Sequence, residues 1–383
     1  MRLAHKQKNH FMYEMILFLT ILIIIKPAFI TEIQSLALVN QIINYIQIML
    51  LFILIFLIIG NKKFQLNNIT FYIILYQIIL AIPTFMYNGS YWDYFSTFVQ
   101  IADVSLLVSL VYTKKREYVF LNAMFWAMAL ILLANLFVML IWPDGWYSGG
   151  RWLFGMENNM LSTILPGITF CLLFSLKYKT KYIQAIIVSL AGVSEIFLGG
   201  SATSMISIVL FATIIIISLL WKKNIQNEKV WFFASIVVSY GIIKFFIQHY
   251  FSYLIVTLLG KDMSLSFRDI VWENALQYIP QKLIFGYGVE NSAYTISKIT
   301  GMHMHNMYLD ILYKCGIIGA LVFYLMLKKS AFINKKNKFI VKKSYDFLFR
   351  ATFAAFFVAF IAEVYTRMPL FYCLIAIVAF ERK

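Results

Sequence analysis

Two histidines lie where a polar segment gives way to an apolar run. His303 and His305 precede the apolar residues 308–327, and Asn306 follows His305 directly. An imidazole titrates near neutral pH, so either histidine can take a proton from a hydroxyl group under physiological conditions. A lone histidine at such a position is more often a surface residue than a base. We take His305 as the first candidate for a general base and His303 as its competitor.

Guanidinium groups form the second set of candidates. Arg268 precedes Trp272 by one helical turn, Arg151 lies in a segment rich in glycine and tryptophan ahead of Asn159, and Arg367 lies in a short turn. Arginine binds phosphate oxygens through two parallel N–H donors, a geometry that lysine lacks. Three arginines on one membrane face would therefore suit a diphosphate. Arg268 and Arg151 also have a simpler interpretation as anchors at the membrane interface.

Other charged residues leave alternatives open. Arg367 lies near Glu363 in the sequence and could merely pair with it. Asp103, Glu195 and Lys244 fall within apolar runs, where a charge is costly unless it is paired or faces a polar cavity. These three residues keep a transporter among the possible functions.

The elements that must position these residues are membrane-spanning helices. Of the 383 residues, 62% are hydrophobic and 13% are charged, whereas roughly a quarter of the residues in soluble proteins are charged. Apolar runs fall at 12–29, 41–60, 69–88, 93–113, 118–142, 159–176, 183–199, 203–221, 230–257, 308–327, 346–364 and 367–381. The pattern predicts an all-α polytopic membrane protein with about twelve transmembrane helices. We interpret residues 1–383 as a single integral membrane domain.

Clusters of basic residues occur at every second connection between these runs, including both ends of the chain. By the positive-inside rule, both termini are predicted to be cytoplasmic. The segment 258–307 then becomes a large extracytoplasmic loop, and residues 266–279 within it have the pattern of a short interfacial helix. The candidate histidines and arginines all fall on this outer face, so the predicted active site is extracytoplasmic.

Several kinds of partner and cofactor are not expected. The net charge of +16 does not indicate nucleic acid, because the basic residues lie in short clusters between apolar runs. The short cytoplasmic connections lack a glycine-rich phosphate loop, and the three cysteines lie in apolar runs without zinc or disulfide spacing. We therefore expect no nucleic-acid partner, no metal and no cofactor. The energy would come from an ion gradient or from an activated substrate in the membrane.

The spacing from His305 to Gly319 is similar to a family signature. His305-Asn306, nine further residues, Gly316, two residues and Gly319 resemble the His-(Asn/Ser/Gln)-x9-Gly-x-x-Gly pattern of the O-antigen ligase and Wzy-type polysaccharide polymerase superfamily. The segment from Arg268 to 288 resembles the sequence that precedes the histidine in this family. Residues 151–159 resemble an outer loop that lies earlier in the family's sequence. The convincing resemblance covers residues 268–327.

The resemblance implies a polymerase of polyprenyl-diphosphate-linked oligosaccharide repeat units, of the kind that build capsule, exopolysaccharide or O-antigen. It implies a metal-independent, inverting glycosyl transfer at the outer face of the cytoplasmic membrane, with donor and acceptor both held in the membrane lipid. His305 and Arg268 would be catalytic, acting on the acceptor hydroxyl and on the leaving diphosphate. Substrate-binding roles would fall to Arg151, Arg367, Asn306, Asn159, Trp272 and His303. A flippase and a chain-length regulator would be fitting partners.

Two other functions stay open. A ligase would use the same site to move a finished glycan to a terminal acceptor, and a secondary transporter or flippase would use about twelve spans without this chemistry. Ala320 favours the polymerase, because ligases often carry threonine there, while Ala202 stands where many relatives have a phosphate-binding arginine. Gly286 and Gly288 are expected to let the loop approach the glycan closely.

Overall fold

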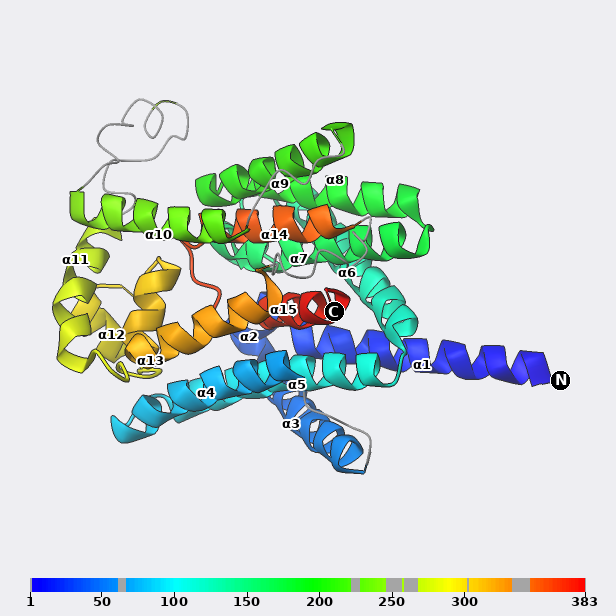
Figure 1. Ribbon diagram of the computed structural model, residues 1–383, viewed down its shortest axis with the longest axis horizontal. Helices are drawn as coiled ribbons and strands as arrows, with labels where there is room; N and C mark the ends of the chain where they lie inside the picture. The colour runs from blue at the N-terminus through cyan, green and yellow to red at the C-terminus, as the bar shows by residue number, and fades with distance from the viewer. Residues whose placement is uncertain are drawn as a thin grey trace.

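Helices make up most of the protein in the computed structural model (Figure 1), which describes residues 2–60, 67–221, 228–245, 257, 268–301, 303–332 and 345–382. The α-helices are α1 (Arg2–Ile25), α2 (Ala28–Glu32), α3 (Ala37–Ile59), α4 (Asn68–Met86), α5 (Tyr91–Thr113), α6 (Glu117–Ile141), α7 (Glu157–Tyr178), α8 (Tyr182–Gly199), α9 (Ala202–Trp221), α10 (Glu228–Phe245), α11 (Arg268–Tyr278), α12 (Ser292–Ile299), α13 (Met307–Ser330), α14 (Asp346–Ala359) and α15 (Pro369–Glu381). Two short strands, β1 (Arg151–Trp152) and β2 (Gly155–Met156), form a hairpin before α7.

Eight helices within the described ranges are long and apolar enough to cross a membrane. They are α3 with the 3-10 turn before it, α4, α5, α6, α7, α8, α9 and α13, and the apolar part of α1 and all of α15 are shorter. The prediction of an all-α, multi-pass membrane protein is therefore confirmed. The number of twelve spans stays a prediction.

The helix predicted within the long connection is confirmed. It is α11, which continues as a 3-10 turn, Ile279–Lys282, with Pro280 in its first turn. A second helix that we did not predict, α12, begins at Asn291, whose side chain accepts a hydrogen bond from Ala293 N at 3.1 Å. Both helices lie at the end of the bundle farthest from the N-terminus (Figure 1). Residue 266, where the predicted helix begins, and the basic residues at 62–63, 222–223 and 333–343 lie outside the described residues.

Helices α14 and α15 are short and have 14 and 13 residues. At 1.5 Å per residue each is about 20 Å long, less than the hydrocarbon thickness of about 30 Å. The loop that joins them, residues 360–368, is largely packed inside the protein: Glu363 and Thr366 are each 3% exposed, and Tyr365 is 1% exposed. The pair of helices thus presents a polar loop within the bundle.

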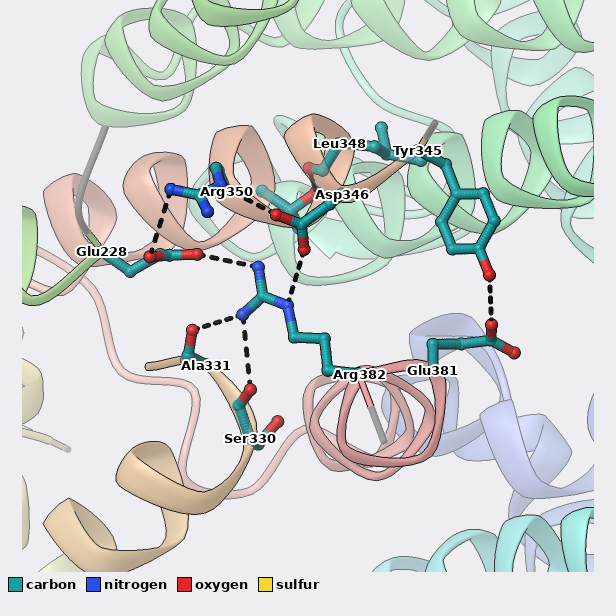
Figure 2. A network of polar contacts seen from close by, with 10 residues as sticks. Glu228, Ser330, Ala331, Tyr345, Asp346, Leu348, Arg350, Glu381 and Arg382 are labelled. Carbon is teal, nitrogen blue, oxygen red and sulfur yellow. Dashed lines mark hydrogen bonds and ion pairs between the residues drawn. The ribbon is translucent and has the colours of Figure 1, made fainter. Parts of the chain in front are cut away.

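A network of charged residues fixes the opposite ends of these two helices (Figure 2). Arg382 binds Glu228 of α10 at 2.8 Å and Asp346 of α14 at 3.0 Å, and Asp346 also binds Arg350 at 2.9 Å. Glu381 accepts hydrogen bonds from Tyr345, Tyr112 and Lys177 at 2.6–2.7 Å. Removing one partner from such a buried network commonly lowers the free energy of unfolding by about 3–5 kcal/mol. The network holds α10, α14 and α15 together and so determines where the 360–368 loop lies.

Candidate active site

Arg268, the first residue of α11, forms an ion pair with Glu363 of the 360–368 loop. The Nη2 and Oε1 atoms are 2.9 Å apart, and the two side chains are 13% and 4% exposed. Burial raises the pKa of Glu363 to about 7, against the opposing effect of the Arg268 charge. The partner of Glu363 is therefore Arg268 and not Arg367, the pairing that the sequence had suggested. The ion pair joins the outer helix α11 to the loop inside the bundle.

The two histidines lie against each other directly before α13. Their ring centres are 3.9 Å apart, and the backbone N–H of His305 donates to Nδ1 of His303 at 3.3 Å. Burial lowers the pKa of His303 to about 4, assisted by the positive charges of Lys314, Arg268 and Arg367. Burial, His303 and Arg268 together lower the pKa of His305 to about 3. Both rings are therefore neutral at physiological pH.

One ring nitrogen of His305 has no hydrogen-bond partner among the described residues. This atom, Nδ1, is buried. The backbone of His305 has a φ of +47°, in the left-handed region that non-glycine residues seldom adopt. Strain of this kind persists only where the surroundings enforce it, and it is frequent at functional sites. Contacts made by Asn306 and Trp272 hold the backbone of this segment in place.

Asn306 and Trp272 supply those contacts. Asn306 is fully buried, and its Oδ1 caps α13 by accepting from Tyr308 N and Leu309 N, both at 3.1 Å. Its Nδ2 donates to Ser239 Oγ at 3.2 Å and to the backbone carbonyl of residue 361 at 2.9 Å. The indole N–H of Trp272 donates to the Met304 carbonyl at 2.8 Å. Every polar atom of these two side chains is occupied inside the protein, and both side chains hold the segment that carries His305; their substrate-binding roles stay predictions.

The remaining predicted arginines lie in different surroundings. Arg367 is exposed, and its contacts with the described residues are long, 3.4 Å to the Asp93 carbonyl and to Thr97 Oγ1. Its charge contributes to the lowered pKa of His303, so it lies within electrostatic range of the histidines. Arg151, on β1, forms an ion pair with Glu32 of α2 at 3.0 Å. No described contact connects Arg151 with His305 or Arg268.

The predicted Asn159 lies in the first turn of α7 and is half-buried. Its backbone carbonyl accepts from Ser162 Oγ at 2.6 Å, and the side chain of its neighbour Asn158 accepts from Ser201 at 3.0 Å. Glu157, which begins the same helix, raises the pKa of Glu363. The start of α7 therefore lies within electrostatic range of the Arg268–Glu363 pair.

Two charged residues of α13 also belong to the site and were not among the predicted site residues. Asp310 is fully buried, pairs with Lys314 at 2.7 Å and accepts a hydrogen bond from Thr366 at 2.9 Å. Both charges act on the pKa of His303, with opposite signs. Their spacing of four residues within an otherwise apolar run is the signal that could have revealed the pair.

The glycines of the family signature interrupt α13. Gly316 has φ +61° and ψ −162°, which is not helical, so the helix breaks there. The freed backbone groups bond to residues 283–288: Ile317 N donates to the Leu283 carbonyl at 2.9 Å, and Tyr287 N donates to the Tyr313 carbonyl at 2.7 Å. Irregular backbone inside a membrane protein needs such internal partners. The apolar run 308–327, predicted as one span, is therefore interrupted at Gly316.

Gly286 and Gly288 allow this contact between the loop and the helices. A Cβ on Gly286 would lie 2.5 Å from the Tyr313 carbonyl oxygen, and a Cβ on Gly288 would lie 2.3 Å from Thr84 N of α4. Both residues have a positive φ near +75°, the region where glycine has no steric penalty. They make room for the protein's own backbone, so the expectation that they make room for a glycan is replaced.

The site thus combines a neutral imidazole with an unpartnered nitrogen, a guanidinium held by a carboxylate, and a second, exposed guanidinium. Such a set can take a proton from a hydroxyl group and stabilise a leaving group that gains negative charge. In the part of the chain that the structure describes, no three His, Cys, Asp or Glu side chains are grouped so that they could hold a metal ion.

Comparison with known proteins gives one match. Residues 185–324 match a family model described as O-antigen ligase, and this range includes Arg268, both histidines and the glycines of α13. The resemblance noted from the sequence is therefore confirmed. Arg151, Glu363 and Arg367 lie outside the matched range. No curated protein and no solved structure matches the chain.

Proposed function

We propose that this membrane protein, which carries an O-antigen ligase family domain, polymerises oligosaccharide repeat units linked to a polyprenyl diphosphate. The family supports glycan transfer from a lipid-linked substrate, and the repeat-unit polymerase is our own narrower assignment. The observation that carries it is the position of a neutral His305, with an unpartnered Nδ1, within electrostatic range of the guanidinium of Arg268.

The proposed reaction is a single displacement. The acceptor hydroxyl oxygen attacks the anomeric carbon of the donor glycan, a new glycosidic bond forms, and the bond from that carbon to the diphosphate oxygen breaks. The hydroxyl proton passes to His305, which later releases it to water. Attack opposite the leaving group inverts the configuration at the anomeric carbon.

Arginine residues would stabilise the diphosphate as it leaves. Arg268 would bind it directly, and Arg367, exposed and within electrostatic range of the histidines, would add a second positive charge. Glu363 acts in this scheme as a positioning residue, because it holds Arg268 before the substrate arrives.

The chemistry is assigned to the extracytoplasmic face of the cytoplasmic membrane. This assignment rests on the alternation of basic clusters along the sequence, which places both termini in the cytoplasm. The glycosyl diphosphate bond is already activated, so the reaction needs no ATP outside the cell. A flippase would deliver the repeat unit to this face, and a chain-length regulator would limit the product.

The test uses purified full-length protein in lipid nanodiscs with a lipid-linked repeat unit. We expect a ladder of products from the wild type and none from His305→Ala or Arg268→Ala, whereas Arg116→Ala keeps the ladder. Arg116 is a suitable control because it is exposed and stacks on Tyr13 far from α11 in the sequence. A full ladder from both site variants would refute the proposed chemistry.

A ligase is the second candidate, favoured by the description of the matched family. It would produce one transfer to a different acceptor and no ladder from repeat units alone. The same assay therefore separates the two functions. Ala320 after the second glycine is the sequence feature that favours the polymerase.

A further inference from the structure

Two lysines meet over one tyrosine ring beside the break in α13. Lys282 Nζ lies 4.6 Å and Lys298 Nζ lies 4.4 Å from the ring centre of Tyr287. The ring is also stacked on Tyr313, with centres 4.7 Å apart and an interplanar angle of 21°. Because Tyr313 covers one face of the ring, the two ammonium groups gather on the side that is left.

The positive charge of this lysine pair is only partly balanced. Glu290 is the carboxylate partner of Lys298 and also accepts a hydrogen bond from Tyr313 at 2.6 Å. Lys282 has no ion pair among the described residues and lies over the ring of Tyr87. Burial and the charge of Lys298 lower the pKa of Lys282, the expected response of two neighbouring cations. An anion bound between them would remove their repulsion.

The surroundings of the lysine pair are apolar and open. Ile284 is 60% exposed, Tyr87 is 42% exposed and Phe285 is 38% exposed. In a multi-pass membrane protein, exposed apolar side chains face lipid, and lysine and tyrosine are typical of the interface where lipid phosphates lie. The site therefore borders the layer from which a lipid-borne phosphate would arrive.

The lysine pair and the histidine site flank the same half of α13. Asn306 caps the helix beside His305, and eight residues later the Lys314 carbonyl accepts from Gly288 N at 2.9 Å, next to Tyr287. That stretch of helix rises about 12 Å. An oligosaccharide can bridge such a gap, so one molecule can place a sugar at His305 and its diphosphate at the lysines.

We propose that Lys282 and Lys298 bind the intact diphosphate of the lipid-linked acceptor. The inference rests on the proposed polymerase function and extends it. A polymerase handles two lipid diphosphates at once: the donor loses its diphosphate at Arg268, and the acceptor keeps its own throughout the reaction. A ligase that transfers to an acceptor without a diphosphate has no use for the second site.

Binding stoichiometry tests this directly. Native mass spectrometry of the full-length protein with polyprenyl diphosphate as the probe should show two bound lipids for the wild type. Lys282→Gln/Lys298→Gln should bind one, while Lys282→Arg/Lys298→Arg should bind two, which controls for folding. Lys114→Gln/Lys115→Gln removes the same charge at exposed positions and should also bind two. Equal numbers of bound lipids on the wild type and on the glutamine variant would overturn the assignment.

Two further measurements identify the ligand. An excess of phosphatidylglycerol should leave both diphosphate lipids bound, and displacement of one of them would show an ordinary headgroup site and refute our assignment. In the assay with a lipid-linked repeat unit, Lys282→Gln/Lys298→Gln should raise KM for the acceptor about tenfold or more, the usual effect of losing a charged contact. The single-turnover rate at saturation should stay within about twofold. If the Arg268 test refuted the polymerase, the wild type should still bind one lipid more than Lys282→Gln/Lys298→Gln, so the two proposals fail separately.

Discussion

Replacing Gly316 by alanine should strongly destabilise the protein. The substitution meets two obstacles in the structure. The backbone at φ +61° and ψ −162° belongs to a region that is essentially restricted to glycine. In addition, a Cβ at this position would lie 2.2 Å from the Ile284 carbonyl oxygen and 2.6 Å from that of Leu283. Both obstacles consist of backbone, which cannot rotate away as a side chain can.

The expected cost follows from these two contributions. Backbone strain of this kind costs about 1–3 kcal/mol. Moving residues 283 and 284 away would also break the bonds from Ile317 N and Ile318 N, now 2.9 Å and 3.3 Å long. Each lost hydrogen bond costs about 1 kcal/mol, or more where the freed group is left without a partner. We expect the free energy of unfolding to fall by about 3–5 kcal/mol.

Equilibrium unfolding in mixed micelles measures this change against two matched glycine variants. Gly200→Ala changes a residue at φ +76° with no atom within 4 Å, so it reports strain alone. Gly149→Ala has neither obstacle and should behave like the wild type. If Gly316→Ala were no less stable than Gly200→Ala, the contact between α13 and residues 283–284 would not have the role that we give it.

Three further outcomes are expected. The rate of polymer formation should fall as the pH drops through about 7, because protonated Glu363 releases Arg268. Glu363→Gln should abolish this pH dependence. A pH dependence that persists in Glu363→Gln would point to another titrating group. The folded-state pKa values of His303 and His305, about 4 and 3, lie below the usual 6.5, so their contribution to stability is complete above pH 6.5 and is lost as the pH falls towards 4. By pH 4 the loss should be up to about 3 kcal/mol for each histidine in pH-dependent unfolding, and it should disappear in His303→Gln/His305→Gln. Asn306→Ala should lower the free energy of unfolding by about 2–3 kcal/mol. Asn306→Ser keeps a capping oxygen and should lose less of that free energy. Equal stability of both variants would contradict the capping role.

The sequence was sufficient for the class of fold and for the central residues of the site. Long apolar runs identify membrane helices because the bilayer demands about twenty consecutive apolar residues, and that demand is local in sequence. The histidine signature and the upstream arginine are also local patterns. The family model also matches local sequence patterns, and its matched range includes His305 and Arg268.

The contacts between distant segments could not be predicted in this way. Glu363 is 95 residues from Arg268, and nothing in either segment indicates that a short helix pair would bring the carboxylate to the guanidinium. The break at Gly316 was not predicted, because an apolar run of this length is interpreted as one continuous helix. Glycine allows a break as readily as close packing, and only the position of residues 283–288 decides between them.

The bonds at Gly316 have a consequence for how this region can vary. They fasten residues 283–284 to residues 317–318, so the intervening stretch, with α12 and both histidines, starts and ends at one place in the bundle. Lengthening a stretch whose ends are already joined costs little chain entropy, about 0.6 kcal/mol for each doubling of its length. Changes in the length of this stretch are therefore expected to cost little chain entropy as long as the bonds between residues 283–284 and 317–318 remain.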